Sequence, residues 1–303
     1  MVKMMRKEKQ GSVDVKDSIG IVGDMGNTAS IESLTLKSEN YIKVEDKASY
    51  IAKIVKEENL AMVNKLSKTV VPKDSFYLKY VKRGIDLIIS VPAFVVLLPV
   101  NFIIGVITFF DVGSPIFFRQ ERTGKDGRHF SLVKFRNMTN AKDKNGNLLP
   151  PSQRVTKFGI FVRKFSLDEL LNFWSIVKGD MTLIGPRPLP SSFDERLSDR
   201  HKMRTAVKPG LECPCINVDN HVRLYQEQFE NDIWYVENAN FLVDCKMFLS
   251  LIKMVMNTKE RGDHSKVGGG DFIGYDENGI AFSMRRIPEK YEKMYLEYLN
   301  RFE

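Results

Sequence analysis

Cysteine and histidine are scarce in this chain. Its 303 residues include three cysteines and four histidines, and the histidines are scattered. An odd number of cysteines without metal-ligand spacing indicates neither a disulfide framework nor a structural zinc site. We therefore expect reduced thiols, as in cytosolic proteins.

Acidic residues are fewer than basic ones, and the formal net charge is +8. Such an excess suits an anionic partner, such as phosphate groups or a membrane surface. The chain has no zinc-finger spacing, no RNA-binding sheet signature and no single basic face. We therefore expect no nucleic acid as a partner.

Charge is absent from residues 87–110. At about 1.5 Å per residue a helix of this length spans a hydrocarbon core of about 30 Å. A buried core helix is the alternative, but an uncharged run this long favours membrane insertion and contact with lipids.

Two features argue that this segment enters the membrane without crossing it. Pro92 and Pro99 interrupt the run, Asn101 follows, and Lys or Arg residues flank both ends. An internal proline removes a helix hydrogen bond, and a simple crossing usually leaves a clearer charge asymmetry. We expect a re-entrant helix that breaks at Pro99, with both ends on the cytoplasmic face of the membrane.

The two ends of the chain differ in pattern. Residues 1–40 are polar without sustained periodicity and are expected to be mostly disordered. Residues 41–68 show helical spacing, which indicates either an amphipathic helix on the membrane or main domain, or a solvated linker. Beyond residue 258, we expect a hairpin at 272–284 and a terminal helix at 288–303.

The centre of the chain mixes helices with short strands. We expect strands near residues 116–120 and 129–135, and a short buried strand at 181–184. We also expect an interfacial helix at 155–164, a helix from Ser166 to just before Gly179, and an exposed charged helix at 193–207. The predicted fold class is α/β, mostly helical with a small sheet.

Asp168 and Glu169 begin the helix expected after Ser166. Ser166 and Glu169 match a capping box, in which the serine binds the amide three residues on and the glutamate reaches back. A structural role in capping is therefore the simple interpretation. The alternative is a site in which one carboxylate is a nucleophile and the other a metal ligand.

Several motifs around this pair resemble the monotopic bacterial phosphoglycosyl transferases, the bacterial sugar transferase family. Their order and spacing match over residues 80–257. The residues that carry the resemblance are Lys134-Phe135-Arg136, Arg154-Val155-Thr156, Arg163 to Leu170, Gly179-Asp180-Met181, Gly185-Pro186-Arg187-Pro188 and Lys208-Pro209-Gly210.

The resemblance implies transfer of a phosphosugar from a UDP-sugar to a polyprenyl phosphate, with release of UMP. This would be the first membrane step of a surface glycan pathway. Asp168 would form a covalent phosphosugar intermediate and Glu169 would hold Mg²⁺. The residues expected to bind substrate are Lys134, Arg136, Arg163, Arg187 and Asp232. Homo-oligomerisation is left open.

The resemblance also implies a domain organisation. Residues 1–75 would be an N-terminal extension, 76–113 the membrane-inserted segment, 114–257 the cytoplasmic catalytic domain, and 258–303 a C-terminal extension. Two positions depart from the family pattern: Leu98 replaces a common serine, and Asn220 stands where an arginine is expected. The divergent stretch from Cys213 to Asn220 and the two terminal extensions support an alternative function, a membrane-tethered binding or assembly protein with weak or no catalysis.

Overall fold

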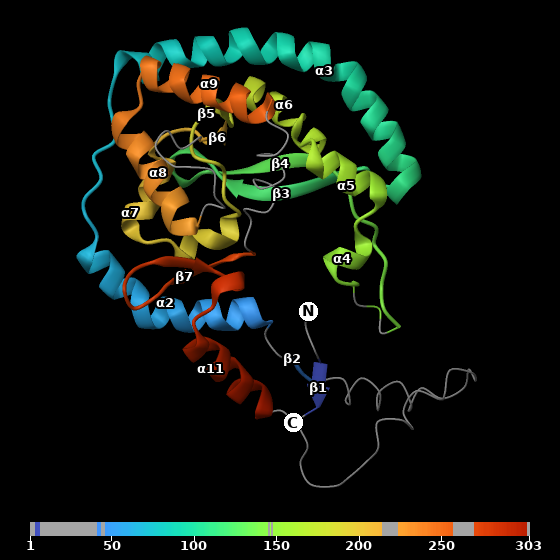
Figure 1. Ribbon diagram of the computed structural model, residues 1–303, viewed down its shortest axis with the longest axis vertical. Coiled ribbons are helices and arrows are strands. Elements are labelled where there is room, and N and C mark those ends of the chain that lie inside the picture. Colours follow the sequence, from blue (N-terminus) through green and yellow to red (C-terminus); the bar gives the residue numbers. More distant parts are fainter. Residues whose placement is uncertain are drawn as a thin grey trace, which may run out of the picture. The chain divides into compact units, whose positions relative to one another are not determined.

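A computed structural model describes residues 4–6, 41–43, 46–144, 146, 148–213, 224–256 and 270–301 (Figure 1). Apart from Met4–Arg6, the disorder expected for residues 1–40 lies outside the described residues, and so does Asn220. The described chain forms two compact units, residues 54–286 and residues 1–53 with 287–303.

The structure is mostly helical with small sheets, as predicted. The helices are α2 (Lys47–Leu66), α3 (Lys82–Val112), α4 (Pro151–Arg154), α5 (Lys157–Lys164), α6 (Asn172–Lys178), α7 (Asp199–Lys202), α8 (Tyr225–Asn238), α9 (Phe241–Met256) and α11 (Glu289–Asn300). Single π or 3₁₀ turns are η2 (Tyr77–Val81), η3 (Lys125–Gly127), η4 (Leu167–Glu169), η5 (Ser191–Arg196), η6 (Met203–Ala206) and η7 (Met284–Arg286). The strands are β1 (Met4–Arg6), β2 (Tyr41–Lys43), β3 (Phe117–Thr123), β4 (His129–Phe135), β5 (Thr182–Ile184), β6 (Gly210–Glu212), β7 (Phe272–Tyr275) and β8 (Ala281–Ser283).

The strands pair two by two. β3 and β4 form an antiparallel hairpin that pairs Phe117 with Phe135 and Thr123 with His129. β5 and β6 are parallel, and their backbones come so close that a Cβ on Gly210 would lie 2.2 Å from the Gly185 amide nitrogen. A side chain at position 210 would therefore push the strands apart, which explains the glycine of the Lys-Pro-Gly motif.

The smaller unit combines both ends of the chain. β1 pairs with β2 in an antiparallel ladder. α11 contacts the beginning of α2, where Tyr50 stacks on Tyr298 with ring centroids 4.2 Å apart and Lys47 pairs with Glu292 at 2.8 Å. The terminal helix expected from the sequence is therefore present as α11.

One long helix, α3, lies against the larger unit. Figure 1 shows it as a single curved helix that passes over α6 and α9. Its backbone stays helical through Pro92 and Pro99, so the predicted break at Pro99 is wrong and the helix is continuous. With η2 it forms the single stretch among the described residues that is long and apolar enough to cross a membrane.

Polar contacts hold both ends of α3 on the same unit. At its beginning, Arg83 donates to the carbonyls of Ile176 and Val177 at 2.6 and 2.9 Å. One turn later, buried Asp86 accepts hydrogen bonds from Thr182 and Leu183 of β5. At its end, Asp111 accepts from the Thr156 hydroxyl, and Arg136 donates to the Val112 carbonyl.

Between these ends, α3 presents large apolar side chains to the outside. Ile88, Val96, Phe102 and Phe110 are each more than 70% exposed. Further exposed apolar side chains come from α5, α6 and α9, namely Ile160, Phe161, Trp174, Phe241, Leu242 and Leu249. Apolar surface on this scale is typical of a protein that contacts a partner or a membrane.

The region of residues 193–207 corrects a prediction. Instead of one exposed helix, the chain forms η5, α7 and η6, and it buries Phe193, Leu197, His201 and Arg204. The buried residues recur every three or four positions, so the spacing was helical. Their side chains, however, enter the core, where they cannot be part of a solvated helix.

Segments outside the matched motifs pack against this region. The predicted hairpin of residues 272–284 is present as β7 and β8. Phe272 and Tyr275 of β7 share a core cluster with Val63 of α2 and with Phe193 and Phe229. The part of α2 within this unit therefore packs on the main domain, which excludes the solvated linker.

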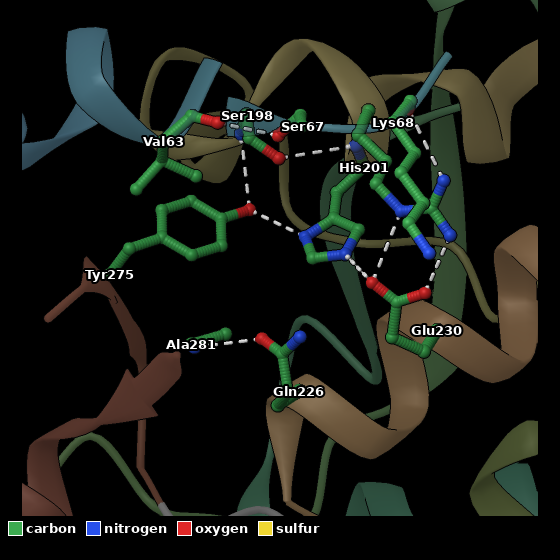
Figure 2. A network of polar contacts seen from close by, with 10 residues as sticks. Val63, Ser67, Lys68, Ser198, His201, Gln226, Glu230, Tyr275 and Ala281 are labelled. Carbon is green, nitrogen blue, oxygen red and sulfur yellow. Dashed lines mark hydrogen bonds and ion pairs between the residues drawn. The ribbon is translucent and has the colours of Figure 1, made fainter. Parts of the chain in front are cut away.

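A network of polar contacts joins the hairpin to α7 and α8 (Figure 2). The ring of His201 lies between the Tyr275 hydroxyl, 2.8 Å from Nδ1, and the Glu230 carboxylate, 3.0 Å from Nε2. Glu230 also accepts from Arg200 at 2.7 Å, and the Ser198 amide donates to Tyr275. The hydrogen bond from His201 and the charge of Arg200 outweigh burial and lower the pKa of Glu230 to about 2.

Candidate active site

Asp168 and Glu169 lie on the single turn η4 rather than on a regular helix. Ser166 adopts a left-handed conformation (φ 54°), and its side chain makes no capping hydrogen bond. The predicted capping box is therefore wrong, and the regular helix α6 begins only at Asn172. A left-handed non-glycine residue is unfavourable, and such strain is most often kept at functional sites.

The Glu169 carboxylate is held by two cations. Lys134 Nζ of β4 and Arg187 Nη2 of the loop after β5 each lie 2.6 Å from Glu169 Oε1. Burial would raise the pKa of Glu169, but the charges of Arg187 and Lys134 outweigh it and lower this pKa to about 2. Glu169 is therefore ionised at neutral pH, and three of the predicted site residues lie together.

The Asp168 carboxylate has weaker partners, although it is only 9% exposed. Asn137 Nδ2 lies 3.4 Å from Asp168 Oδ2, and Arg163 donates to Asn137 Oδ1 at 2.9 Å. Burial, and then the charge of Glu169, raise the pKa of Asp168. Arg163 thus reaches Asp168 through Asn137, a residue that the sequence analysis missed.

Two predicted substrate-binding residues lie elsewhere. Arg136 donates to the Val112 carbonyl at the end of α3, and no described contact joins it to the carboxylate pair. Asp232 is 1% exposed and forms a 2.6 Å ion pair with Arg204. Because buried Asp232 does not line the site, its assignment as a substrate-binding residue is corrected.

Arg204 links Asp232 to the site indirectly. Its Nη2 donates to the Arg187 backbone carbonyl at 2.7 Å. A buried carboxylate thus orients an arginine that holds the loop bearing Arg187. The described contacts thus connect Asp232 and Arg204 to Glu169 through Arg187.

A small cavity adjoins Glu169 and contains residues that the sequence analysis did not single out. Its polar lining comes from Arg122, Lys134, Glu169, Asn172 and Arg187. The strand register contains a signal for Arg122. Lys134 pairs with Phe118 and Phe130 pairs with Arg122, so alternation places Arg122 and Lys134 on one face of the hairpin.

A larger apolar groove lies between α3 and the β3–β4 hairpin. Its volume is about 580 Å³, and its lining includes Asn101, Phe102 and Phe109 of α3, Phe135 of β4 and Leu171. Leu171 follows Asp168 by three residues, and Phe135 follows Lys134 directly. The groove therefore borders the chain segments that carry Lys134 and Asp168.

A divalent cation would find few protein ligands here. Within the described ranges, no three His, Cys, Asp or Glu residues cluster as a metal site. Both described ion pairs of Glu169 are on Oε1, which leaves Oε2 for a cation. Mg²⁺ is often bound by one carboxylate with substrate phosphates and water, so these donors fit Mg²⁺ that arrives with a phosphate substrate.

Comparisons with known proteins identify the family of this chain. The profile of the family described as bacterial sugar transferase matches residues 77–258. The chain is 41% identical over 146 residues to the uncharacterized sugar transferase EpsL of Bacillus subtilis (strain 168), which covers 48% of this chain and 72% of that protein.

Two relatives with named activities are longer. The Aeromonas hydrophila UDP-N-acetylgalactosamine-undecaprenyl-phosphate N-acetylgalactosaminephosphotransferase is 29% identical over 58% of this chain and 44% of its own length. The Klebsiella pneumoniae UDP-glucose:undecaprenyl-phosphate glucose-1-phosphate transferase is 32% identical over 58% of this chain and 40% of its own length. This chain thus spans less than half of each. The match over more than half of its residues, together with the resemblance predicted from the motifs, shows that the chain belongs to the bacterial sugar transferase family of phosphoglycosyl transferases.

Proposed function

We propose that this protein transfers a phosphosugar from a UDP-sugar to a polyprenyl phosphate, releasing UMP. The different environments of Asp168 and Glu169 carry the proposal. Glu169 is clamped by two cations, whereas Asp168 has one long hydrogen bond. Neighbouring carboxylates in unequal environments commonly divide the roles of a reaction.

The loosely held carboxylate is the nucleophile. An Asp168 oxygen attacks the phosphorus that bears the sugar, and the bond from this phosphorus to the UMP oxygen breaks. The result is an acyl phosphate on Asp168 and free UMP. An oxygen of the polyprenyl phosphate then attacks the same phosphorus, the bond to Asp168 breaks, and a polyprenyl diphosphate sugar is formed. Two displacements regenerate the carboxylate.

Charge is the main obstacle, because nucleophile, donor and acceptor are all anionic. Lys134 and Arg187 keep Glu169 ionised and hold it beside Asp168. Mg²⁺, when bound by Glu169 Oε2 and the donor phosphates, would neutralise part of this charge. Arg163 orients Asp168 through Asn137. The protein therefore supplies positioning and electrostatic stabilisation.

The lipid acceptor reaches the site from a membrane into which α3 is inserted. Both ends of α3 bind the same compact unit, through Arg83 and Asp86 at one end and Asp111 at the other. A helix that crossed a core of about 30 Å would place its ends on opposite sides. We therefore propose that α3 lies in one leaflet, with both ends and the site at the cytoplasmic face.

UMP release tests the reaction. Purified full-length protein in nanodiscs would be given undecaprenyl phosphate, Mg²⁺ and, in turn, UDP-glucose, UDP-galactose, UDP-N-acetylglucosamine and UDP-N-acetylgalactosamine. We expect UMP with at least one donor, and a mass increase of one phosphosugar on the peptide containing Asp168 when the acceptor is omitted. UMP without that adduct would refute the covalent step, and no UMP with any donor would favour the binding or assembly protein.

Cysteine labelling tests the topology. Single cysteines at Ser75 and Ser114, in a background without Cys213, Cys215 and Cys245, would be exposed to a membrane-impermeant reagent in intact cells. We expect both positions to be protected until the membrane is opened. Labelling of one position but not the other in intact cells would demonstrate a crossing helix.

A further inference from the structure

Arg122 brings a charge into the site cavity without a direct ion pair to any described carboxylate. Its Nη1 donates to the Pro188 carbonyl at 3.0 Å, and its Nη2 donates to Gln120 Oε1. Its buried Nε has no hydrogen-bond partner in the described structure. Both contacts are to neutral oxygens, so the guanidinium is partly held in place while its charge has no direct partner among the described residues.

The other two cations of the cavity are already paired. Lys134 and Arg187 both bind Glu169, and Arg187 also lies 3.5 Å from Glu212. Burial, and then repulsion by Arg187, lower the pKa of Arg122 to about 10. The charge of Glu169 offsets only part of this effect, and a buried charge without a direct ion pair is unfavourable. An anion in the cavity would remove this cost.

A second residue with an unpaired buried polar atom lines the same cavity. Asn172, at the beginning of α6, is 4% exposed, and its Oδ1 has no hydrogen-bond partner in the described structure. The cavity therefore offers an unsatisfied cationic donor and an unsatisfied neutral acceptor. A phosphate that carries a hydroxylated sugar has the complementary groups, an anion and a hydroxyl donor.

We propose that Arg122 binds the nucleotide-side phosphate of the donor and stabilises it as it leaves, while Asn172 accepts a hydrogen bond from a sugar hydroxyl. The proposal rests on the proposed function. When the bond from the sugar-bearing phosphorus to the bridging oxygen breaks, its electron pair stays on that oxygen, and the UMP phosphate becomes more negative. The guanidinium therefore binds the leaving group more strongly than the intact donor, which is the condition for catalysis.

Nucleotide binding to full-length protein in nanodiscs tests this assignment. Isothermal titration would use UDP, UMP, uridine and inorganic pyrophosphate with wild type, Arg122→Gln and Arg122→Lys. We expect Arg122→Gln to weaken binding of UDP, UMP and pyrophosphate at least about tenfold, since one charge-assisted pair is lost. Uridine binding should not change. Arg122→Lys should retain an intermediate affinity, because lysine keeps the positive charge but lacks the planar guanidinium that donates two parallel hydrogen bonds.

Arg119→Gln is the matched control. Arg119 lies on the same strand, is exposed, and points to the opposite face by strand alternation. It should bind all four ligands like wild type. For turnover, Arg122→Gln should lower kcat more than it raises KM for the donor.

Unchanged binding of UDP and UMP by Arg122→Gln would overturn the proposal. An equal loss of uridine binding by this variant would overturn it as well. If Arg122→Gln does not fold, wild-type kcat and wild-type affinities for the phosphate ligands in Arg122→Lys would overturn it. If wild type binds pyrophosphate but no uridine nucleotide, the donor assignment fails. A loss of that pyrophosphate binding in Arg122→Gln would still support an anion site at Arg122.

Discussion

The site at Glu169 and the network at His201 are both built from buried charges and hydrogen bonds, but they are completed to different degrees. In the His201 network, every described buried side-chain nitrogen and oxygen has a partner. In the site, Arg122 Nε and Asn172 Oδ1 have none. Native proteins rarely leave such atoms unpaired. The complete network is satisfied within the protein, whereas the proposed ligand would satisfy the incomplete one.

The difference extends to the carboxylates. Glu230 and Glu169 both have a pKa lowered to about 2 by basic partners. Asp168 is the exception, since its pKa is raised by burial and by the charge of Glu169. Substitutions in the site should therefore change turnover more than stability, and substitutions in the network should do the reverse.

Asp168→Asn should have the largest effect. We expect kcat to fall by at least about 10⁴-fold, because a carboxamide is a poor nucleophile. Unfolding temperature at pH 7 should stay the same or rise. The raised pKa of Asp168 means that folding disfavours its ionised form, so removing that charge above the folded pKa removes a cost.

UMP release and scanning fluorimetry would measure both effects, with exposed Asp126→Asn as the control variant. Near-normal turnover by folded Asp168→Asn protein would refute the nucleophile. A large loss of stability would show that Asp168 belongs with the structural carboxylates.

Asp232→Ala tests the buried ion pair between Asp232 and Arg204, which holds the loop that carries Arg187. Removing one partner of a buried pair leaves the Arg204 charge uncompensated, which should cost roughly 3–5 kcal/mol of unfolding free energy. The double variant Asp232→Leu/Arg204→Met should recover much of this stability. Turnover should stay low, because the contact from Arg204 to the Arg187 carbonyl is absent.

Chemical denaturation and UMP release would separate these effects, with Glu237→Gln on the same helix as the control. If the double variant regained both stability and turnover, Arg204 would have no positioning role.

Glu169→Gln should reduce stability by roughly 2 kcal/mol, since Lys134 and Arg187 lose the charge that they share. For wild type, the pKa of Glu169 is lowered to about 2 from an unfolded value of about 4.3. The contribution of Glu169 is therefore complete above about pH 5 and is lost as pH falls through about 2.

Turnover of Glu169→Gln should require more Mg²⁺ than that of wild type. Denaturation between about pH 5 and pH 2, and turnover at graded Mg²⁺, would measure the two effects. An unchanged Mg²⁺ requirement would exclude Glu169 as a ligand.

Tyr275→Phe should have the smallest effect. It removes the hydroxyl that contacts His201 Nδ1 and accepts from the Ser198 amide, at a cost of about 1–2 kcal/mol. We expect kcat and KM to stay within about twofold of wild type at a temperature where the variant is folded. A selective fall in kcat at that temperature would show that the His201 network serves the reaction. The distinction between a structural network and a catalytic site would then be wrong.

Local patterns predicted much of this molecule. Strand alternation and turn residues located the β3–β4 hairpin and the β7–β8 hairpin, because the period of a strand and the chemistry of a tight turn are local properties. The uncharged run located α3, and the matched motifs brought attention to Asp168, Glu169, Lys134 and Arg187. These features depend on neighbours in the chain, which a single sequence displays.

Tertiary contacts decided what local patterns could not. Ser166 and Glu169 match a capping box, yet two cations from distant segments bind Glu169, and ion pairs to both outweigh one capping hydrogen bond. In the sequence, Asp232 resembles an exposed acidic residue of a helix, but in the structure it forms a buried ion pair with Arg204. Pro99 predicts a break, but α3 remains helical and its ends are fixed by polar contacts to one unit. The sequence by itself thus determined which segments are helix, strand or apolar. The partners of each charge were decided only by the fold, because electrostatic energy depends on distance and burial in space, not on separation along the chain.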